Sequence, residues 1–131
     1  MKPGREMDAL VAEKVMGWRR RTEEDTAKGD LDPELGPWFF DADGCLADVP
    51  FYSTDISAAM EAFAQMKDYR GLHWSIEWIH PWSAYPQGGW WVKADDWCGS
   101  LDPEASNLRV DVVHDDLAYA IAQAVLQAVA L

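Results

Sequence analysis

Three neighbouring hydroxyl side chains, Tyr52, Ser53 and Thr54, stand immediately before a segment with helical periodicity. The free backbone N–H groups and the positive end of the dipole at a helix start can together bind a phosphate group. A simpler interpretation is that Ser53, Thr54 and Asp55 only cap the helix, which is worth about 1 kcal/mol to the fold. The charge of Asp55 favours the cap, because it already complements the positive end of the dipole.

Tryptophan is the second residue type that suggests binding, since it makes up 8 of the 16 aromatic residues. Trp74 and Trp78 alternate on one face of a predicted strand, and we expect both in the core. A second set combines rings with cationic groups, in a turn, on the opposite face or near a strand end: Trp82, Trp91, Trp97, His73, Lys93 and Arg109. Such a set could stack a nucleotide base, each stack being worth about 1–3 kcal/mol. Alternatively, helices on both faces of the sheet would bury Trp91 as well as Trp74.

Catalysis and metal binding have little support in the sequence. The adjacent carboxylates of Asp95-Asp96 and Asp115-Asp116 need not converge on one reacting group, and neither Cys45 nor Cys98 has a recognisable base. The three histidines show no zinc-ligand spacing to either cysteine. We therefore expect a protein that is not an enzyme, with no catalytic residues, no metal and no cofactor.

The formal net charge of −12 belongs almost wholly to the larger, C-terminal part of the chain. Residues 1–28 sum to +1, whereas residues 29–131 sum to −13. Because non-specific nucleic-acid binding depends on neutralising phosphates with Lys and Arg, we expect no direct DNA or RNA binding. The one basic cluster, Arg19-Arg20-Arg21, is interpreted as the solvated end of a helix, where cations complement the dipole, with an anion contact as the alternative.

The segment at the start of the chain and the lengths of the apolar runs bear on location. Residues 1–6 are polar and no apolar h-region follows them, so we expect no secretory signal. The longest apolar runs are far shorter than the ~20 residues of a membrane helix. The sequence therefore predicts a cytoplasmic protein that does not associate with membranes.

Hydrophobic periodicity predicts three helices and several strands. Helical spacing covers residues 6–18, 56–69 and 117–129, while strand patterns cover a small hairpin at 38–49 and the segments 72–79, 89–95 and 108–113. Residues 21–36 are rich in charge and glycine and are predicted to be an exposed loop. Helices separated by hairpin-like strands favour an α+β domain with a mainly antiparallel sheet covered by helices. At 131 residues, a single domain is expected.

Two segments, Met7–Trp18 and Val49–Ala59, together with the alanine-rich final helix, resemble the phage ABA-sandwich domain family of small phage and prophage proteins. The Tyr-Ser-Thr-Asp-Ile run at 52–56 is the most specific part. The resemblance implies a three-layer α/β/α sandwich, encoded among phage accessory genes and acting in the host cell. It supplies no catalytic residues. The charged insert at 19–34 and the long turn at 80–89 depart from the family pattern.

Two hypotheses follow, from different classes of protein. In the first, a phage accessory protein without catalytic activity sequesters a host small molecule, such as a nucleotide-type immune signal, in aromatic pockets built between subunits. In the second, the anionic body is an interaction module that mimics nucleic acid or assembles with phage proteins. In both, surplus tryptophan predicts a homo-oligomer that hides part of it.

Overall fold

The computed structural model describes residues 1–83, 86–95 and 108–131, and combines helices with strands. The helices are α1 (Arg5–Lys14), α2 (Glu23–Lys28), α3 (Ile56–Met66), the short 3₁₀ helix η1 (Tyr69–Gly71) and α4 (Leu117–Val129). The strands are β1 (Arg19–Arg20), β2 (Phe39–Phe40), β3 (Leu46–Ala47), β4 (His73–Ile79), β5 (Gly89–Asp95) and β6 (Leu108–His114). They form two three-stranded antiparallel sheets, so the predicted α+β class is confirmed.

The larger sheet has the order β4-β5-β6 and one apolar face. Cross-strand partners on that face include Ile76 opposite Val92 and Val92 opposite Val112. Helix α4 packs against β5 and β6 on this face, and Ile121 and Val125 of α4 are completely buried there. The alternation of the strand sequences and the alanine-rich helix face thus build the core together.

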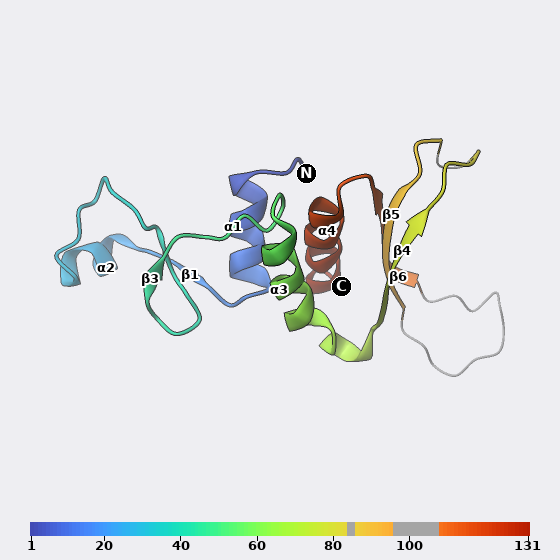
Figure 1. Ribbon diagram of the computed structural model, residues 1–131. Coiled ribbons are helices and arrows are strands. Elements are labelled where there is room, and N and C mark those ends of the chain that lie inside the picture. Colours follow the sequence, from blue (N-terminus) through green and yellow to red (C-terminus); the bar gives the residue numbers. More distant parts are fainter. Residues whose placement is uncertain (84–85, 96–107) are drawn as a thin grey trace.

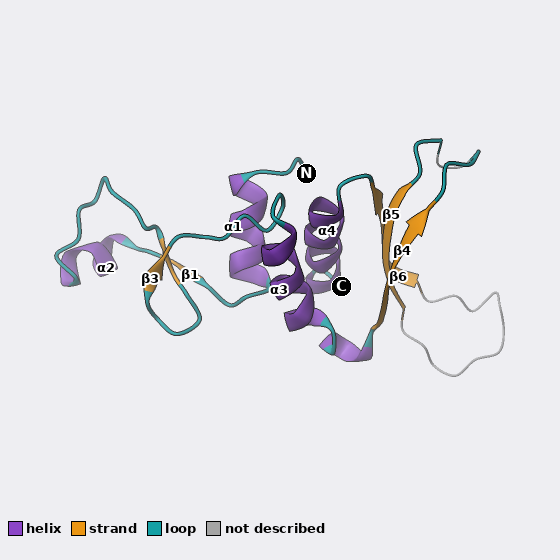
Figure 2. Cartoon of the chain, in the orientation of Figure 1, coloured by secondary structure: helices purple, strands orange, loops and turns teal. Residues whose placement is uncertain are grey.

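Helices α1, α3 and α4 lie between the two sheets (Figure 1). Figure 1 shows α1, α3 and α4 side by side in the middle of the molecule, with the larger sheet on one side and the small β1-β2-β3 sheet and α2 on the other. Figure 2 shows the same arrangement by element type, with the described helices on a single face of the larger sheet. The antiparallel sheet covered by helices is therefore present, whereas a second helix layer on its other face is not among the described elements.

Local signals fix the starts of three helices. Asp55 and Asp116 each accept a hydrogen bond from a backbone N–H in the first turn, of Ser57 at the start of α3 and of Tyr119 at the start of α4. Thr22 begins α2 with a capping box, in which its hydroxyl accepts from the Asp25 N–H and the Asp25 carboxylate accepts from the Thr22 N–H. The predicted cap at Asp116 is confirmed.

The segment after the first helix was predicted wrongly. Helix α1 ends at Lys14, four residues before Trp18, and the Arg19-Arg20 pair forms strand β1 rather than a helix end. The segment 21–36, expected to be a loop, contains α2. The reason is tertiary: β1 pairs with β2 about twenty residues further along the chain, and local charge composition does not report such a pairing.

The expected core pair of Trp74 and Trp78 was also only half right. The Trp74 side chain packs against the core, but Trp78 is 47% exposed. Both lie on the predicted face of β4, and α4 covers β5 and β6 instead of this edge strand. The alternation of residues in β4 therefore predicted which face of the strand is apolar. It could not predict that α4 does not extend over this strand.

Candidate functional site

The Ser53 side chain connects two distant segments of the chain. Its hydroxyl donates to Oδ1 of Asp8 at 2.7 Å, and its backbone N–H donates to the same oxygen at 2.8 Å. The Gly4 N–H donates to the Ser53 hydroxyl oxygen at 2.9 Å. Both Ser53 and Asp8 are completely buried. Ser53 thus holds the start of α1 against the segment before α3, and its hydroxyl faces a carboxylate.

The neighbours of Ser53 point in different directions. Tyr52 is buried, and the burial raises its pKa to about 12, with smaller contributions from the negative charges of Glu61 and Asp8. Thr54 is exposed. The three hydroxyls expected to act together are therefore separated by the fold, and Asp55 alone caps α3.

Trp91 and Lys93 lie together on the face of the larger sheet that points away from the helices. The Trp91 Nε1–H donates to Oδ1 of Asp111 at 2.6 Å, and the Lys93 ammonium lies 3.9 Å from the centroid of the Trp91 ring. The same ammonium lies 3.6 Å from a carboxylate oxygen of Glu77. The Glu77 carboxylate thus pairs with this cation, and the cation covers one face of the Trp91 ring.

The other predicted site residues are distributed along the same half of the molecule. His73 is exposed at the start of β4, and Trp82 is 55% exposed in the turn that follows β4. Arg109 is in β6, but its side chain and all of Trp97 lie outside the described part of the structure. The structure therefore does not bring the predicted set together around one described cavity.

One cavity does include a predicted residue. It has a volume of about 500 Å³ and lies where α3, η1 and β4 meet, and it is lined by Phe63, Lys67, Asp68, Gly71, Leu72, His73 and Trp74. The rings of Phe63 and Trp74 meet edge to face, with centroids 5.5 Å apart. The Trp74 Nε1–H donates to the Met66 carbonyl at 3.1 Å, which fixes the indole. The cavity combines a fixed aromatic wall with the side chains of Lys67 and His73.

The chain reversal between α3 and β4 creates this cavity. Arg70 and Gly71 both have a left-handed backbone, with φ of 52° and 69°. Leu72 is then buried, and the alternation of β4 begins directly after it. Sequence reasoning missed Phe63 and Lys67 as site residues because their approach to His73 depends on this reversal. Gly71, expected near the helix end, was the available signal.

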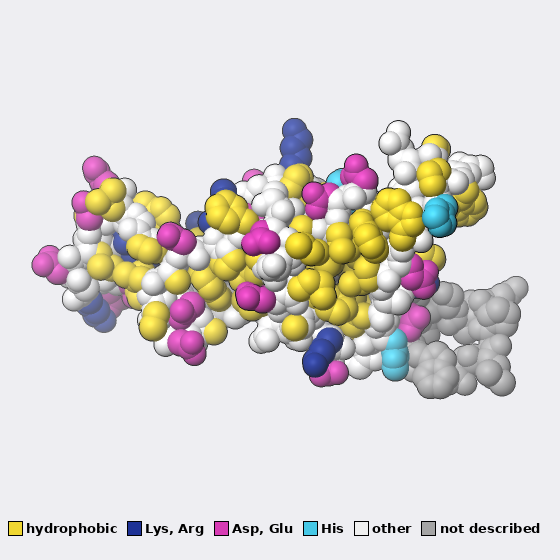
Figure 3. Space-filling view, viewed as in Figure 1, with side chains coloured by type: hydrophobic (Ala, Val, Ile, Leu, Met, Phe, Trp, Pro, Cys, Tyr) yellow, Lys and Arg dark blue, Asp and Glu magenta, His cyan; other side chains and the backbone are white. Residues whose placement is uncertain are grey.

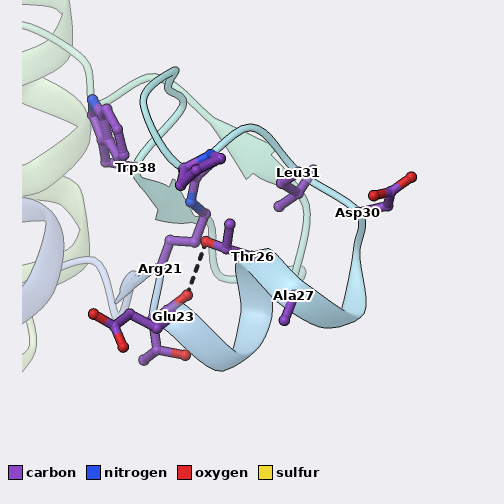
Figure 4. A pocket seen from close by; sticks show the side chains of 9 residues that line it. Arg21, Glu23, Thr26, Ala27, Asp30, Leu31 and Trp38 are labelled. Atoms are coloured by element: carbon purple, nitrogen blue, oxygen red, sulfur yellow. Dashed lines mark hydrogen bonds between the residues drawn. The ribbon is translucent and has the colours of Figure 1, made fainter.

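A second cavity, of about 470 Å³, lies beside α2. Figure 4 shows the residues that line this cavity. Arg21, Glu23 and Thr26 lie along one side, Asp30 and Leu31 follow the end of α2, and Trp38 lies opposite. The Arg21 guanidinium donates to the carbonyls of Pro37 and Asp32 at 3.2 and 2.9 Å and lies over the Trp38 ring. Because the Arg21 guanidinium is engaged in these contacts within the protein, the charged groups that remain in the lining are the carboxylates of Glu23 and Asp30.

The basic cluster is held by aromatic rings on the neighbouring strand. Arg19 lies 4.5 Å from the Phe40 ring centroid and Arg20 lies 5.0 Å from that of Phe39, each pair being opposite in the β1-β2 register. Arg19 also pairs with Asp25, whose carboxylate has a pKa well below its usual range because of this hydrogen bond and those from Thr22. An external anion at this cluster would therefore compete with the carboxylates of Asp25 and Glu13, which already pair with Arg19 and Arg20.

The described residues contain neither a metal-binding cluster nor a membrane-spanning helix. Among them no group of three or more His, Cys, Asp and Glu side chains is placed to hold a metal ion. Cys45 is exposed with a free thiol, and Cys98 lies outside the described residues. In the same described part, none of the helices has the length and apolar character needed to cross a bilayer.

The chain was compared with family models, curated proteins and solved structures, and none of them matches it. The resemblance to phage ABA-sandwich proteins thus rests on the sequence segments alone.

Proposed function

We propose that this protein binds a nucleotide-type small molecule without transforming it, in the cavity between α3 and β4. The observation that carries the proposal is the lining of that cavity, in which the Phe63–Trp74 ring pair adjoins the side chains of Lys67 and His73. Rings of this kind stack bases, and an ammonium group with an imidazole can hold a phosphate. Asp68 lies in the same lining and can accept hydrogen bonds from a ribose or a base edge.

The resemblance to phage proteins supports a particular biological setting for this binding. We propose a phage accessory protein, a single domain acting in the host cytoplasm, that sequesters a host immune signal. The complete three-layer sandwich implied by the resemblance belongs to the same proposal. Its first helix layer corresponds to α3 and α4, and a further layer would lie against the sheet face that carries Trp91.

Calorimetry with ADP-ribose and a cyclic nucleotide as probes tests the binding. One of the two should bind with a defined stoichiometry and be recovered intact after heat denaturation of the complex. The variant Lys67→Ala should weaken binding about tenfold or more, because a hydrogen bond to a charged group is worth about 1.5–3 kcal/mol. The matched control is Lys14→Ala, which removes an exposed lysine from the end of α1.

Two results would count against the proposal. Recovery of a cleaved nucleotide would indicate an enzyme. Equal affinities in Lys67→Ala, Lys14→Ala and the unaltered protein would place the ligand elsewhere.

A specific observation supports the second candidate, the acidic interaction module. Trp38 and Leu35 are 48% and 63% exposed on the part of the chain that carries the small sheet, and Trp38 lines the same cavity as Glu23 and Asp30. Exposed apolar groups among carboxylates suit a basic protein partner. A pull-down from host lysate at low and high salt tests it, since capture of a basic protein that is lost at high salt supports this candidate, and the same yield at both salts opposes it.

A further inference from the structure

Within the described part of the chain, strand β4 is an edge strand with one unpaired side. In the order β4-β5-β6 it pairs only with β5, and no other described strand pairs with it through residues 73–79. The opposite edge is partly covered, because the Asp111 N–H of β6 donates to the side chain of Gln127 in α4 at 3.3 Å. Backbone groups along an uncovered edge favour pairing with a further strand.

The apolar face of β4 is also incompletely covered. None of its seven residues is buried, and Trp78 is 47% exposed although its ring lies 5.3 Å from that of Trp90. On α3, Ile56 and Met60 are also exposed, by 43% and 42%. Figure 3 shows hydrophobic side chains gathered on this face of the molecule, over the helices and the adjoining sheet.

We propose that a second copy of this chain occupies this edge, with the two β4 strands antiparallel about a two-fold axis at Ile76. In this register Trp74 lies opposite Trp78 of the second copy, Ser75 lies opposite Glu77, and His73 lies opposite Ile79. Every residue of β4 has a partner and no two like charges face each other. The inner faces of both sheets remain on the same side, so the pairing gives one continuous six-stranded sheet.

The neighbouring registers are less favourable for physical reasons. A shift by one residue would place the inner face of one strand beside the outer face of the other. An axis at Glu77 would set two carboxylates directly opposite each other, which destabilises a strand pair. An axis at Ser75 would leave Trp78 and Ile79 without partners in the β4 strand of the second copy. The strand is therefore most self-complementary about Ile76.

The pairing also adds to the proposed ligand site, and this part of the inference rests on the proposed function. Trp74 lines the cavity with Phe63 and His73. Pairing about Ile76 brings Trp78 of the second copy beside Trp74, where it extends the aromatic wall. Each dimer would then carry two sites, each lined by residues of both chains.

Charge predicts how salt affects this dimer. Each copy has a net charge of −12, so two copies repel at low ionic strength, and added salt screens the repulsion. The dimer should therefore tighten with salt. A complex of this acidic chain with a basic protein would weaken under the same conditions, so salt distinguishes a second copy from a basic partner at this edge.

Analytical ultracentrifugation of the full chain at two salt concentrations provides the test. We expect a dimer whose Kd falls as salt rises. Ser75→Glu should raise this Kd about tenfold, because it sets a carboxylate opposite Glu77 at two symmetric positions, whereas the uncharged variant Ser75→Gln should preserve the dimer. Within one chain Ser75 lies opposite Lys93, so the glutamate is compatible with the fold, which circular dichroism checks.

The outcomes separate the two proposals. A monomer at all concentrations and salts, or a dimer equally stable in Ser75→Glu and Ser75→Gln, would overturn the pairing even if ADP-ribose or the cyclic nucleotide binds. A dimer with the expected variant pattern that binds neither probe would support the pairing and count against the proposed function.

Discussion

The two sheets of this protein are stabilised in different ways. The larger sheet has seven-residue strands, and it buries Val92, Val110 and Val112 against α4. The small sheet has two-residue strands, and arginine side chains lie over the aromatic rings of its central strand. Apolar burial supports a cooperative core, whereas exposed cation–π contacts contribute only about 0.5–1 kcal/mol each. The comparison indicates that the small sheet can open while the larger one stays folded.

The largest effect is expected in the core beneath the larger sheet. Ile121→Ala removes a completely buried side chain of α4 and should lower the free energy of unfolding by about 2–5 kcal/mol. Urea denaturation followed by circular dichroism measures this. Leu126→Ala, at a half-buried position of the same helix, is the control and should cost less. Equal losses would mean that burial against the sheet is not what stabilises α4.

The junction between α1 and the segment before α3 should show the next largest effect. Asp8→Ala leaves the buried hydroxyl and N–H of Ser53 without their acceptor, and should destabilise the fold by about 1–3 kcal/mol. Thermal unfolding compares it with Asp43→Ala, which removes an exposed carboxylate. A melting temperature of Asp8→Ala that matches that of Asp43→Ala would show that the buried hydrogen bonds are replaceable.

In the small sheet the expected effect is smaller and local. Arg21→Ala removes the stacking on Trp38 and two hydrogen bonds to carbonyls, and should increase amide exchange in β2 while amides of β5 stay protected. Hydrogen exchange with mass spectrometry measures both strands at once. Lys28→Ala, which removes only an exposed ion pair with Glu24, serves as the control. Faster exchange in β5 as well would show that the two sheets unfold together.

The smallest effect at neutral pH concerns Tyr52. Its folded-state pKa of about 12 is higher than the ordinary value, so its contribution to stability is complete below about pH 10 and is lost as pH rises through 10 to 12. Tyr52→Phe has no titratable hydroxyl and should lose less stability over that range. Unfolding curves at pH 8 and pH 11 make the comparison. A parallel loss in both proteins would assign alkaline sensitivity to other groups.

Local pattern predicted the larger sheet and its helices well. Strand alternation located β4 and β5, helical spacing located α3 and α4, and Asp116 marked the start of the last helix. These features depend on neighbours within a few residues. The arginine cluster depends instead on the register of β1 against β2, which the local pattern does not contain.

The candidate site could be predicted only in part for a related reason. His73 was predicted from its strand, but Trp74 was expected only in the core. Phe63 of α3 and Lys67 directly after it approach these two residues only because of the reversal at Arg70 and Gly71. Ser53 was a candidate phosphate ligand or cap because its hydroxyl stands before a helix, but in the structure this hydroxyl donates to Asp8. The role of these residues depends on how the helices and strands approach each other in space, and residue types along the sequence do not contain that information.

The edge-to-face contact between Trp78 and Trp90 has an optical consequence. Two indoles with centroids 5.3 Å apart and planes inclined at 70° form a chiral pair of coupled chromophores. Their transitions should split into an exciton couplet in the far ultraviolet, superimposed on the helix bands. Helix content read directly from the circular dichroism spectrum would then be biased, and Trp78→Phe should remove the couplet while leaving the backbone signal unchanged.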